Sequence, residues 1–380
     1  MLLSLALIFI FGLFFSKIFS FCKIPDVVGM IFAGIVLNFF GLLDQSIINI
    51  SAELRQIALV IILTRAGLSL DFDKLKKVGR PAMMLSCVPA LFEIVSITIV
   101  GHLIFNVPFL TSAILGCVVA AVSPAIIVPR MIKLQETGYG ADKNIPELIL
   151  TGASVDDIFV IILFYSFLNF DSSNLIFIPI NIILGIVFGI ISALILLFLL
   201  KKFNVSINSS TLIFLSTSFV LLKIEDFVSF SALLAIMVMG IVFYRKDLSL
   251  ANALSAKFSG LWSGASIILF VLVGFSMNIE YALSEGVKPI ILILICLIGR
   301  SLGTYLCLIG TNLNKNERIF CVMAYLPKAT VQAAIGAIPL SLGVPYGELI
   351  LTVSVISIVI TAPLGAFLID GSYKKLLQKH

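Results

Sequence analysis

Apolar runs long enough to cross a lipid bilayer recur along this sequence of 380 residues. A spanning helix needs about 20 mainly apolar residues. Hydrophobic residues make up 60% of the chain and charged residues 12%, whereas about 25% of the residues of a soluble domain are charged. Because lipid offers no hydrogen-bond partner to the backbone, such runs fold as helices. The sequence therefore predicts an all-α polytopic membrane protein without a soluble domain.

The spacing of the apolar runs predicts thirteen transmembrane helices. In residue numbers, the predicted spans are 2–20, 25–43, 54–70, 81–105, 109–129, 146–168, 174–200, 209–224, 228–244, 258–278, 287–310, 317–340 and 346–370. An odd number of spans places the two ends of the chain on opposite sides of the membrane.

Basic residues are distributed unequally between the two sets of alternate loops. One side carries 19 Lys and Arg residues and the other side 3. Because cytoplasmic loops are enriched in basic residues, this predicts an N terminus outside the cell and a cytoplasmic C terminus, in the plasma membrane. The net charge of +5 comes from these short loops, so it does not indicate a nucleic-acid partner.

Two adjacent aspartates, Asp156 and Asp157, lie inside the apolar run TGASVDDIFVIILF. A carboxylate near the middle of the bilayer costs about 2.5–3.5 kcal/mol on insertion scales, so such residues are rare and functional. The pair needs a compensating partner, which is a bound cation, a proton or a buried base. A structural cluster of salt bridges is the alternative to a cation and proton site.

Three further charged residues matter within the predicted spans: Glu93, Arg300 and Lys328. Glu93 and Arg300 lie in the middle of their spans, where neither side chain easily reaches water. Since an unpaired ion is costly in hydrocarbon, we expect Glu93 and Arg300 to form an ion pair. Lys328 follows Pro327 in the twelfth span, and we expect it to lie near the aspartates.

Two of the predicted spans contain a helix-breaking proline. Pro124 follows Ser123 in the fifth span, and Pro327 precedes Lys328 in the twelfth. Proline removes a backbone donor and interrupts a helix. Non-helical backbone is tolerated at membrane depth only inside protein or beside a wet cavity, and a broken span in each half of a transporter points to an inverted repeat with its site at the midplane. The spans 81–168 and 287–370 both follow the order charged helix, broken helix, closing helix.

The sequence resembles a known family at these motifs. AVSPAIIVPRMIKLQETGYGADKNIPELILTGASVDDIF, YLPKATVQAAIG, RAGLSLD and ITAPLG are similar to motifs of the monovalent cation/proton antiporter superfamily, and in particular of its NHA-type sodium/proton antiporters. The resemblance covers nearly the whole chain. It implies the antiporter fold of about thirteen transmembrane helices, with inverted repeats and two crossed broken helices.

The same resemblance implies a division into domains and a homodimer. Residues 1–80 (helices 1–3) and 206–280 (helices 8–10) match the dimerisation domain. Residues 81–170 (helices 4–6) and 281–380 (helices 11–13) match the core domain, and residues 171–205 match the linker helix 7.

The resemblance also assigns roles at the double aspartate. Asp157 matches the principal cation- and proton-binding carboxylate, and Asp156 matches its partner, so a transported Na⁺ is expected at these two residues. Backbone oxygens near Val122 and Ala153 match positions that help to coordinate the ion. Ser123 belongs to the Ser-Pro motif of the fifth span, which lacks the aspartate that some bacterial relatives carry there.

The resemblance assigns supporting ion pairs to the remaining charges. Arg300 matches the basic residue of the eleventh span, which is a lysine in electrogenic relatives. Glu93 matches the acidic partner of that arginine, and Lys328 matches a lysine close to the aspartates.

These features predict a secondary active antiporter that exchanges Na⁺ or Li⁺ for H⁺ by an elevator-like alternating-access mechanism, with no cofactor and no enzymatic activity. A K⁺/H⁺ antiporter or a cation channel of the same fold is the main alternative. An organic-anion or bile-acid symporter lacks the double aspartate, and an intramembrane aspartyl protease needs a Gly-x-Gly-Asp motif that this sequence lacks.

Overall fold

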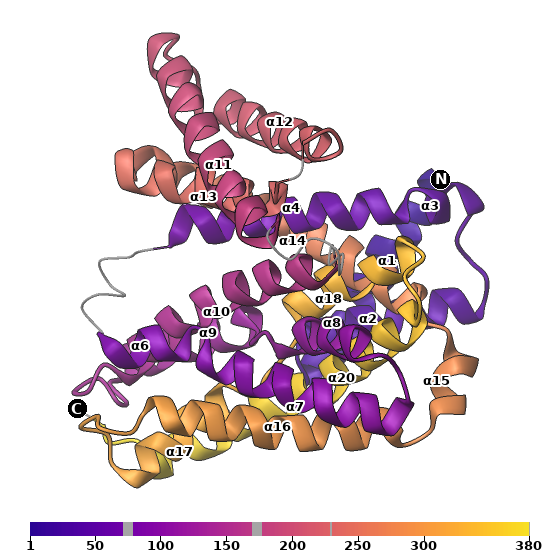
Figure 1. Cartoon of the computed structure of the whole chain (residues 1–380), viewed down its shortest axis with the longest axis vertical. Coiled ribbons are helices and arrows are strands. Elements are labelled where there is room, and N and C mark those ends of the chain that lie inside the picture. Colours follow the sequence, from indigo (N-terminus) through magenta and orange to yellow (C-terminus); the bar gives the residue numbers. More distant parts are fainter. Residues whose placement is uncertain (71–78, 169–176, 229, 380) are drawn as a thin grey trace. The chain divides into compact units, whose positions relative to one another are not determined.

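The computed structural model describes residues 1–70, 79–168, 177–228 and 230–379, and these residues form an all-helical protein (Figure 1). Contacts between residues divide the chain into two compact units. Unit 1 consists of Met1–Ala52, Phe72–Phe167 and Leu269–His380, and unit 2 consists of Glu53–Asp71 and Leu168–Ile268. The predicted division into core, linker and dimerisation domains stays a prediction.

Unit 1 contains the helices that carry the charged residues of the predicted site. Its helices are α1 (Leu2–Phe21), α2 (Asp26–Phe39), α3 (Gln45–Asn49), α6 (Arg80–Leu85), α7 (Val88–Phe105), α8 (Phe109–Ala120), α9 (Pro124–Thr137), α10 (Ile145–Leu168), α15 (Ile279–Glu285), α16 (Lys288–Cys307), α17 (Lys315–Ala324), α18 (Thr330–Gly336), α19 (Ile338–Ser341) and α20 (Gly347–Leu376).

Unit 2 is built from helices of 15 to 28 residues. It contains α11 (Phe177–Lys202), α12 (Ile207–Glu225), α13 (Ala232–Lys246) and most of α4 (Ser51–Ser69) and α14 (Leu248–Phe275). Within this unit, α11 packs along α13. The start of the predicted seventh span, 174–176, lies outside the described residues.

In the described part of the chain, nine helical stretches are long and apolar enough to cross a membrane. This confirms a polytopic membrane protein. Each predicted span falls on one helix or on two or three successive helices. Four of the thirteen predicted spans do not coincide with one of these nine stretches. They fall on the shorter helices α2 and α13, on α4 with its three charged residues, and on the interrupted pair α17 and α18.

Two helical stretches of unit 1 are interrupted where the prolines predicted it. Helix α8 ends at Ala120 and α9 begins at Pro124, while α17 ends at Ala324 and α18 begins at Thr330. Pro124 occupies the first turn of α9, where its missing N–H costs nothing, and Ser123 is the N-cap. The chain of the first interruption therefore runs extended through Ala121 before the new helix starts.

Glycines on α16 let this helix approach α7 closely. A methyl group added at Gly303 would lie 2.9 Å from Cα of Pro89 and 3.0 Å from Cβ of Phe92. Gly299, one turn earlier, faces Ser96 of α7 in the same way. Small residues four apart allow such contact between membrane helices. The sequence GRSLG therefore brings α7, which carries Glu93, against α16, which carries Arg300.

Candidate functional site

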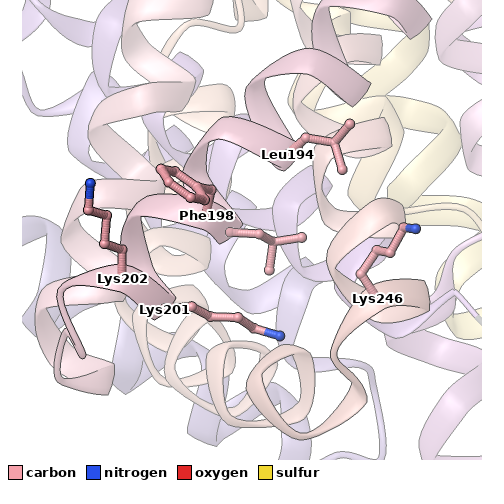
Figure 2. A pocket seen from close by; sticks show the side chains of 6 residues that line it. Leu194, Phe198, Lys201, Lys202 and Lys246 are labelled. Atoms are coloured by element: carbon pink, nitrogen blue, oxygen red, sulfur yellow. The ribbon is translucent and has the colours of Figure 1, made fainter.

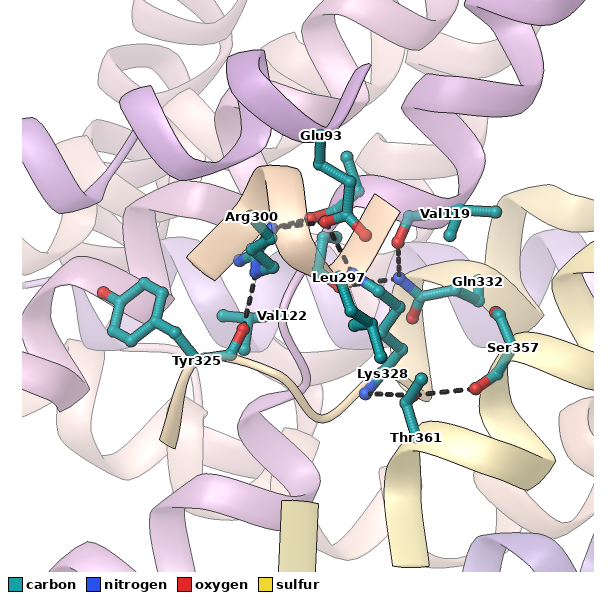
Figure 3. Close-up of polar contacts among 12 residues, drawn as sticks. Glu93, Val119, Val122, Leu297, Arg300, Tyr325, Lys328, Gln332, Ser357 and Thr361 are labelled. Carbon is teal, nitrogen blue, oxygen red and sulfur yellow. Dashed lines mark hydrogen bonds and ion pairs between the residues drawn. The ribbon is translucent and has the colours of Figure 1, made fainter. Parts of the chain in front are cut away.

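The two interruptions of unit 1 meet each other. The N–H of Ser123, at the end of the first interruption, donates a hydrogen bond of 2.8 Å to the carbonyl oxygen of Pro327 in the second. All the residues at this meeting point are buried. A buried N–H or C=O without a partner is costly, so the neighbouring helices must supply partners for the backbone groups that the interruptions free. Those partners form the candidate site (Figure 3).

Asp156, on α10, is fully buried and is held by two donors. Its Oδ2 atom accepts a hydrogen bond of 2.9 Å from the N–H of Val122, in the first interruption, and one of 2.9 Å from Nη2 of Arg300. The other oxygen, Oδ1, is buried without a hydrogen-bond partner. Asp156 thus ties α10 to the interruption and to α16.

Arg300, on α16, lies at the centre of the contacts and is fully buried. Its Nη1 atom contacts Oε2 of Glu93 at 3.0 Å and also donates to the carbonyl of Ala120, at the end of α8. Its Nε atom donates to the carbonyl of Tyr325 at 2.5 Å, and the guanidinium lies 5.7 Å from the centroid of the Tyr325 ring. The predicted ion pair between Glu93 and Arg300 is confirmed (Figure 3).

Lys328, in the second interruption, pairs with Glu93. Its Nζ atom lies 2.7 Å from Oε2 of Glu93, and both side chains are fully buried. The N–H of Lys328 donates to Oγ1 of Thr361, on α20, at 3.0 Å. Lys328 also lies close enough to Asp156 to interact with it electrostatically, as the sequence predicts, and its ion pair is with the carboxylate of α7. Glu93 therefore compensates two basic groups with one oxygen.

Asp157 differs from Asp156 in having no such partner. In the described ranges, the carboxylate of Asp157 makes no ion pair, and its Oδ1 atom is buried without a hydrogen-bond partner. We call Glu93, Asp156, Asp157, Arg300 and Lys328 the charged cluster. It holds three carboxylates and two basic groups, so one negative charge is left uncompensated when every member is ionised.

The other predicted site residues lie around the two aspartates. Ala153 is buried on α10, one turn before Asp157, and the hydroxyl of Ser123 is buried without a partner. Val122 contributes its N–H to Asp156, and coordination of the ion by a backbone oxygen near this position stays a prediction. The structure thus brings Asp156, Val122, Glu93, Arg300 and Lys328 into one network of contacts.

Sequence reasoning assigned no role to Gln332 and Tyr325. Gln332, on α18, is fully buried and its Nε2 atom donates to the carbonyls of Val119 and Ala121, at the end of α8. Tyr325 accepts a hydrogen bond from Arg300 through its backbone carbonyl. A glutamine inside an apolar span is a visible signal. The binding of an arginine by a backbone carbonyl cannot be predicted from the residue type, because every residue has this group.

A groove on the surface of unit 2 has a lining that differs in composition from the charged cluster. Figure 2 shows this groove, which is lined by Leu194, Leu197, Phe198, Lys201, Lys202 and Lys246. The lining residues are apolar or basic and include no carboxylate. The lining offers no carboxylate ligand to a cation, so the groove is not a candidate for the cation site.

The chain is similar to known exchangers over almost its whole length. Residues 5–370 match the transmembrane sodium/hydrogen exchanger family. Sodium/hydrogen exchanger 9B2 of Mus musculus is 34% identical over 378 residues, which cover 94% of this chain and 69% of that protein. Sodium/hydrogen exchanger 9B1 of Homo sapiens is 30% identical over 405 residues, covering 100% of this chain and 79% of that protein.

The fold is similar to that of a solved antiporter structure. The sodium proton antiporter MjNhaP1 from Methanocaldococcus jannaschii, at pH 8, superposes with a TM-score of 0.82 over 98% of this chain and 97% of that chain, at 20% sequence identity. This likeness shows that the fold is of the NhaP1 type.

Proposed function

Because the chain belongs to the sodium/hydrogen exchanger family, we propose that it exchanges Na⁺ (or Li⁺) for H⁺ at Asp157, with Asp156 as the partner carboxylate. The chain is a membrane transporter and not an enzyme. One observation carries the choice of Asp157. Of the three carboxylates in the charged cluster, Glu93 and Asp156 are compensated by Arg300 and Lys328, and the third has no basic partner among the described residues.

The charge of the cluster accounts for the coupling of the two ions. With Asp157 ionised and empty, the cluster carries one net negative charge. One proton or one Na⁺ on Asp157 cancels this charge, so the two loaded states are electrically equal. Moving the empty, charged state through a low-dielectric environment is costly. Only loaded states then cross, and competition of the two ions for one carboxylate gives obligatory exchange.

Residues of the proposed ion site carry buried oxygen atoms without hydrogen-bond partners. A hard cation such as Na⁺ takes carboxylate, carbonyl, hydroxyl and water oxygens as ligands. The buried Oδ1 atoms of Asp156 and Asp157 and the hydroxyl of Ser123 have no hydrogen-bond partner in the structure. These three atoms, with the backbone oxygens near Val122 and Ala153, are the ligand set that we propose.

We further propose that the fold contains thirteen transmembrane helices in two inverted repeats with crossed broken helices. The order of elements supports this proposal. Helices α7 and α16 carry Glu93 and Arg300, the interrupted pairs α8–α9 and α17–α18 follow, and α10 and α20 close the two sets. The hydrogen bond between Ser123 and Pro327 supports the crossing.

Alternating access by an elevator-like movement is the mechanism that we propose for this architecture. The charged cluster lies wholly within residues 81–170 and 281–380, which supports the proposal that these ranges move as one core. Residues 1–80 and 206–280 then form the dimerisation domain of a homodimer in the plasma membrane, with residues 171–205 as the linker and the C terminus in the cytoplasm.

Transport in proteoliposomes tests the proposed function. Purified protein is reconstituted with a pH-sensitive dye inside the vesicles, and Na⁺, Li⁺ or K⁺ is added outside. We expect Na⁺ or Li⁺ to drive proton release, and Asp157→Asn to abolish it in protein that still folds and inserts. Full activity of Asp157→Asn would overturn the site. Release driven by K⁺ alone would favour the K⁺/H⁺ alternative, and cation flux without proton coupling would favour a channel.

A further inference from the structure

The buried end of helix α8 needs partners for its backbone carbonyls. The last four C=O groups of a helix have no partner within the helix. Val119, Ala120 and Ala121, at this end, are at most 1% exposed, so protein atoms must bind these carbonyls in place of solvent. Arg300 binds the carbonyl of Ala120, which leaves its two neighbours to another side chain.

Gln332 binds both of the neighbouring carbonyls. Its Nε2 atom donates to the carbonyl oxygen of Val119 at 2.9 Å and to that of Ala121 at 2.6 Å (Figure 3). Only the NH₂ group of an amide can donate. Because both partners are acceptors, the chemistry itself fixes the orientation of this amide. Its Oε1 atom is buried and has no hydrogen-bond partner.

These bonds fix the peptide segment that faces Asp156. The carbonyls of Val119 and Ala121 are held by Gln332 and that of Ala120 by Arg300, while the next N–H, that of Val122, donates to Asp156. Without the amide, the segment loses two of the bonds that set the direction of the Val122 N–H. Gln332 therefore acts on the site through the backbone of the first interruption.

The absence of a charge on Gln332 is as important as its two donors. Lysine and arginine side chains also bind the terminal carbonyls of helices. A basic side chain at this position would add a third positive charge to the charged cluster. Three carboxylates and three basic groups would balance without any transported ion, so Asp157 would no longer require a cation.

We propose that Gln332 is a positioning residue of the cation site, a neutral cap that holds the end of α8 and leaves one negative charge for the transported cation. This inference rests on the proposed function of Asp157. It adds a requirement for that function, which is that the carbonyls freed by the interruption must be bound without adding charge.

Hydroxyl groups on α20 hold α18 and Lys328 in place beside this cap. Ser354 donates to the carbonyl of Gln332 at 2.8 Å, Ser357 donates to the carbonyl of Ser354 at 2.6 Å, and Thr361 donates to that of Ser357 at 2.7 Å. Thr361 in turn accepts the hydrogen bond from the N–H of Lys328. One face of α20 thus fixes both ends of the segment that carries Gln332.

Two substitutions separate the donors of Gln332 from its neutrality. Gln332→Met keeps the length of the side chain and removes both donors. We expect a KM for Na⁺ about ten-fold higher than that of the wild type, with a smaller change in the maximal rate, because leaving buried carbonyls unpaired costs about the free energy of one hydrogen bond or more.

Gln332→Lys keeps donors for both carbonyls and adds a charge. We expect it to fold but to lose Na⁺-driven proton release and the rise in melting temperature that Na⁺ gives to the wild type.

A buried hydroxyl in unit 2 provides the matched control. Ser218, on α12, is fully buried and donates to the carbonyl of Phe214. Ser218→Ala loses a buried hydrogen bond, and we expect it to keep the wild-type KM for Na⁺. Any drop in melting temperature of the Gln332 variants is measured against this control.

The outcomes distinguish this inference from the proposed function. A wild-type KM in folded Gln332→Met, or Na⁺-driven transport with a wild-type KM in Gln332→Lys, would overturn the role of Gln332, while loss of transport in Asp157→Asn would still support the cation site. Should Gln332→Met fail to fold, the Gln332→Lys result decides. If Asp157→Asn transports normally, the proposed function itself is wrong.

Discussion

Lys328 and Glu93 form a fully buried ion pair of 2.7 Å between Nζ and Oε2, and the same oxygen atom lies 3.0 Å from Nη1 of Arg300. One carboxylate of α7 thus binds a helix and an interruption that are distant from it in the sequence. Because Lys328 pairs with Glu93, Arg300 is the basic residue that forms an ion pair with an aspartate in the described part of the chain. The free charge of the cluster then falls on Asp157.

We expect the two ion pairs of Glu93 to contribute strongly to the stability of the fold. Removing one partner of a buried pair costs about 3–5 kcal/mol, because an unpaired charge stays behind. We expect Glu93→Ala, Arg300→Ala and Lys328→Ala each to lower the melting temperature in detergent. The double change Glu93→Ala with Lys328→Ala should cost less than the sum of the two single changes, and Glu93→Ala with Arg300→Ala likewise. Glu93→Ala combined with Ser218→Ala is the additive control, and additive losses in the first two cycles would contradict the coupling.

The two aspartates should differ in their effect on stability. Asp156→Asn weakens the charge-assisted bonds from Arg300 and Val122, and we expect a loss of about 1.5–3 kcal/mol. Asp157→Asn removes a carboxylate without a basic partner in the described residues, so we expect an unchanged or higher melting temperature in Na⁺-free buffer. A larger loss for Asp157→Asn than for Asp156→Asn would show that Asp157 has a structural partner.

Gly303 should be intolerant of a methyl group, since this atom would lie 2.9 Å from the backbone of Pro89 on α7. We expect Gly303→Ala to cost about 1–3 kcal/mol, as overpacking does, and to raise the KM for Na⁺ by moving Glu93 away from Arg300. Gly264, on α14, has nothing within 4 Å of such a methyl group. Gly264→Ala is therefore the matched control and should be neutral or stabilising by about 0.5–1 kcal/mol. Equal effects of the two changes would remove the argument for close helix packing.

We expect the ionisation of Asp247, in unit 2, to make the folding stability weakly dependent on pH. Hydrogen bonds from Lys201, the Leu250 N–H and Ser249 lower the pKa of Asp247 to about 2. Since the folded pKa lies below the unfolded value, the contribution to stability is present above about pH 4 and is lost as the pH falls towards 2. Lys201 is 60% exposed, so the contribution is below about 1 kcal/mol. The melting temperature of Asp247→Asn should lie slightly below that of the wild type at neutral pH, and high salt should narrow the gap. A gap that persists at the lowest pH would exclude ionisation as its cause.

Apolar runs were sufficient to predict most helices. They did not predict where a run is divided into two helices. The predicted span 146–168 is close to α10, Ile145–Leu168, because nothing in that run breaks a helix. The span 81–105 is divided into α6 and α7 near Ser86 and Cys87, since Pro89 in the next turn lacks the N–H that a continuous helix needs.

The partners within the site were less predictable than its members. The charged residues stood out because ions are rare in apolar spans. Their pairing depends on how closely α7 and α16 approach, which the glycines of GRSLG permit but do not specify. Hydrogen bonds that go to backbone carbonyls, such as those of Gln332 and Arg300, depend on where the opposite interruption lies in space. No spacing within one segment encodes that position.

The charge of the cluster predicts that transport does not depend on voltage. Arg300 cannot release a proton during the cycle, because a guanidinium stays protonated in proteins. Lys328 can in principle, but it forms an ion pair of 2.7 Å with Glu93, and we expect this pair to persist through the cycle. Asp157 is then the one group that exchanges its proton, and one Na⁺ replaces one H⁺. We expect Na⁺-driven proton flux in proteoliposomes to have the same rate and end point at clamped potentials of either sign. A flux that changes with voltage would contradict one-for-one exchange and identify Lys328 as the second proton carrier, in which case Lys328→Gln should remove the voltage dependence.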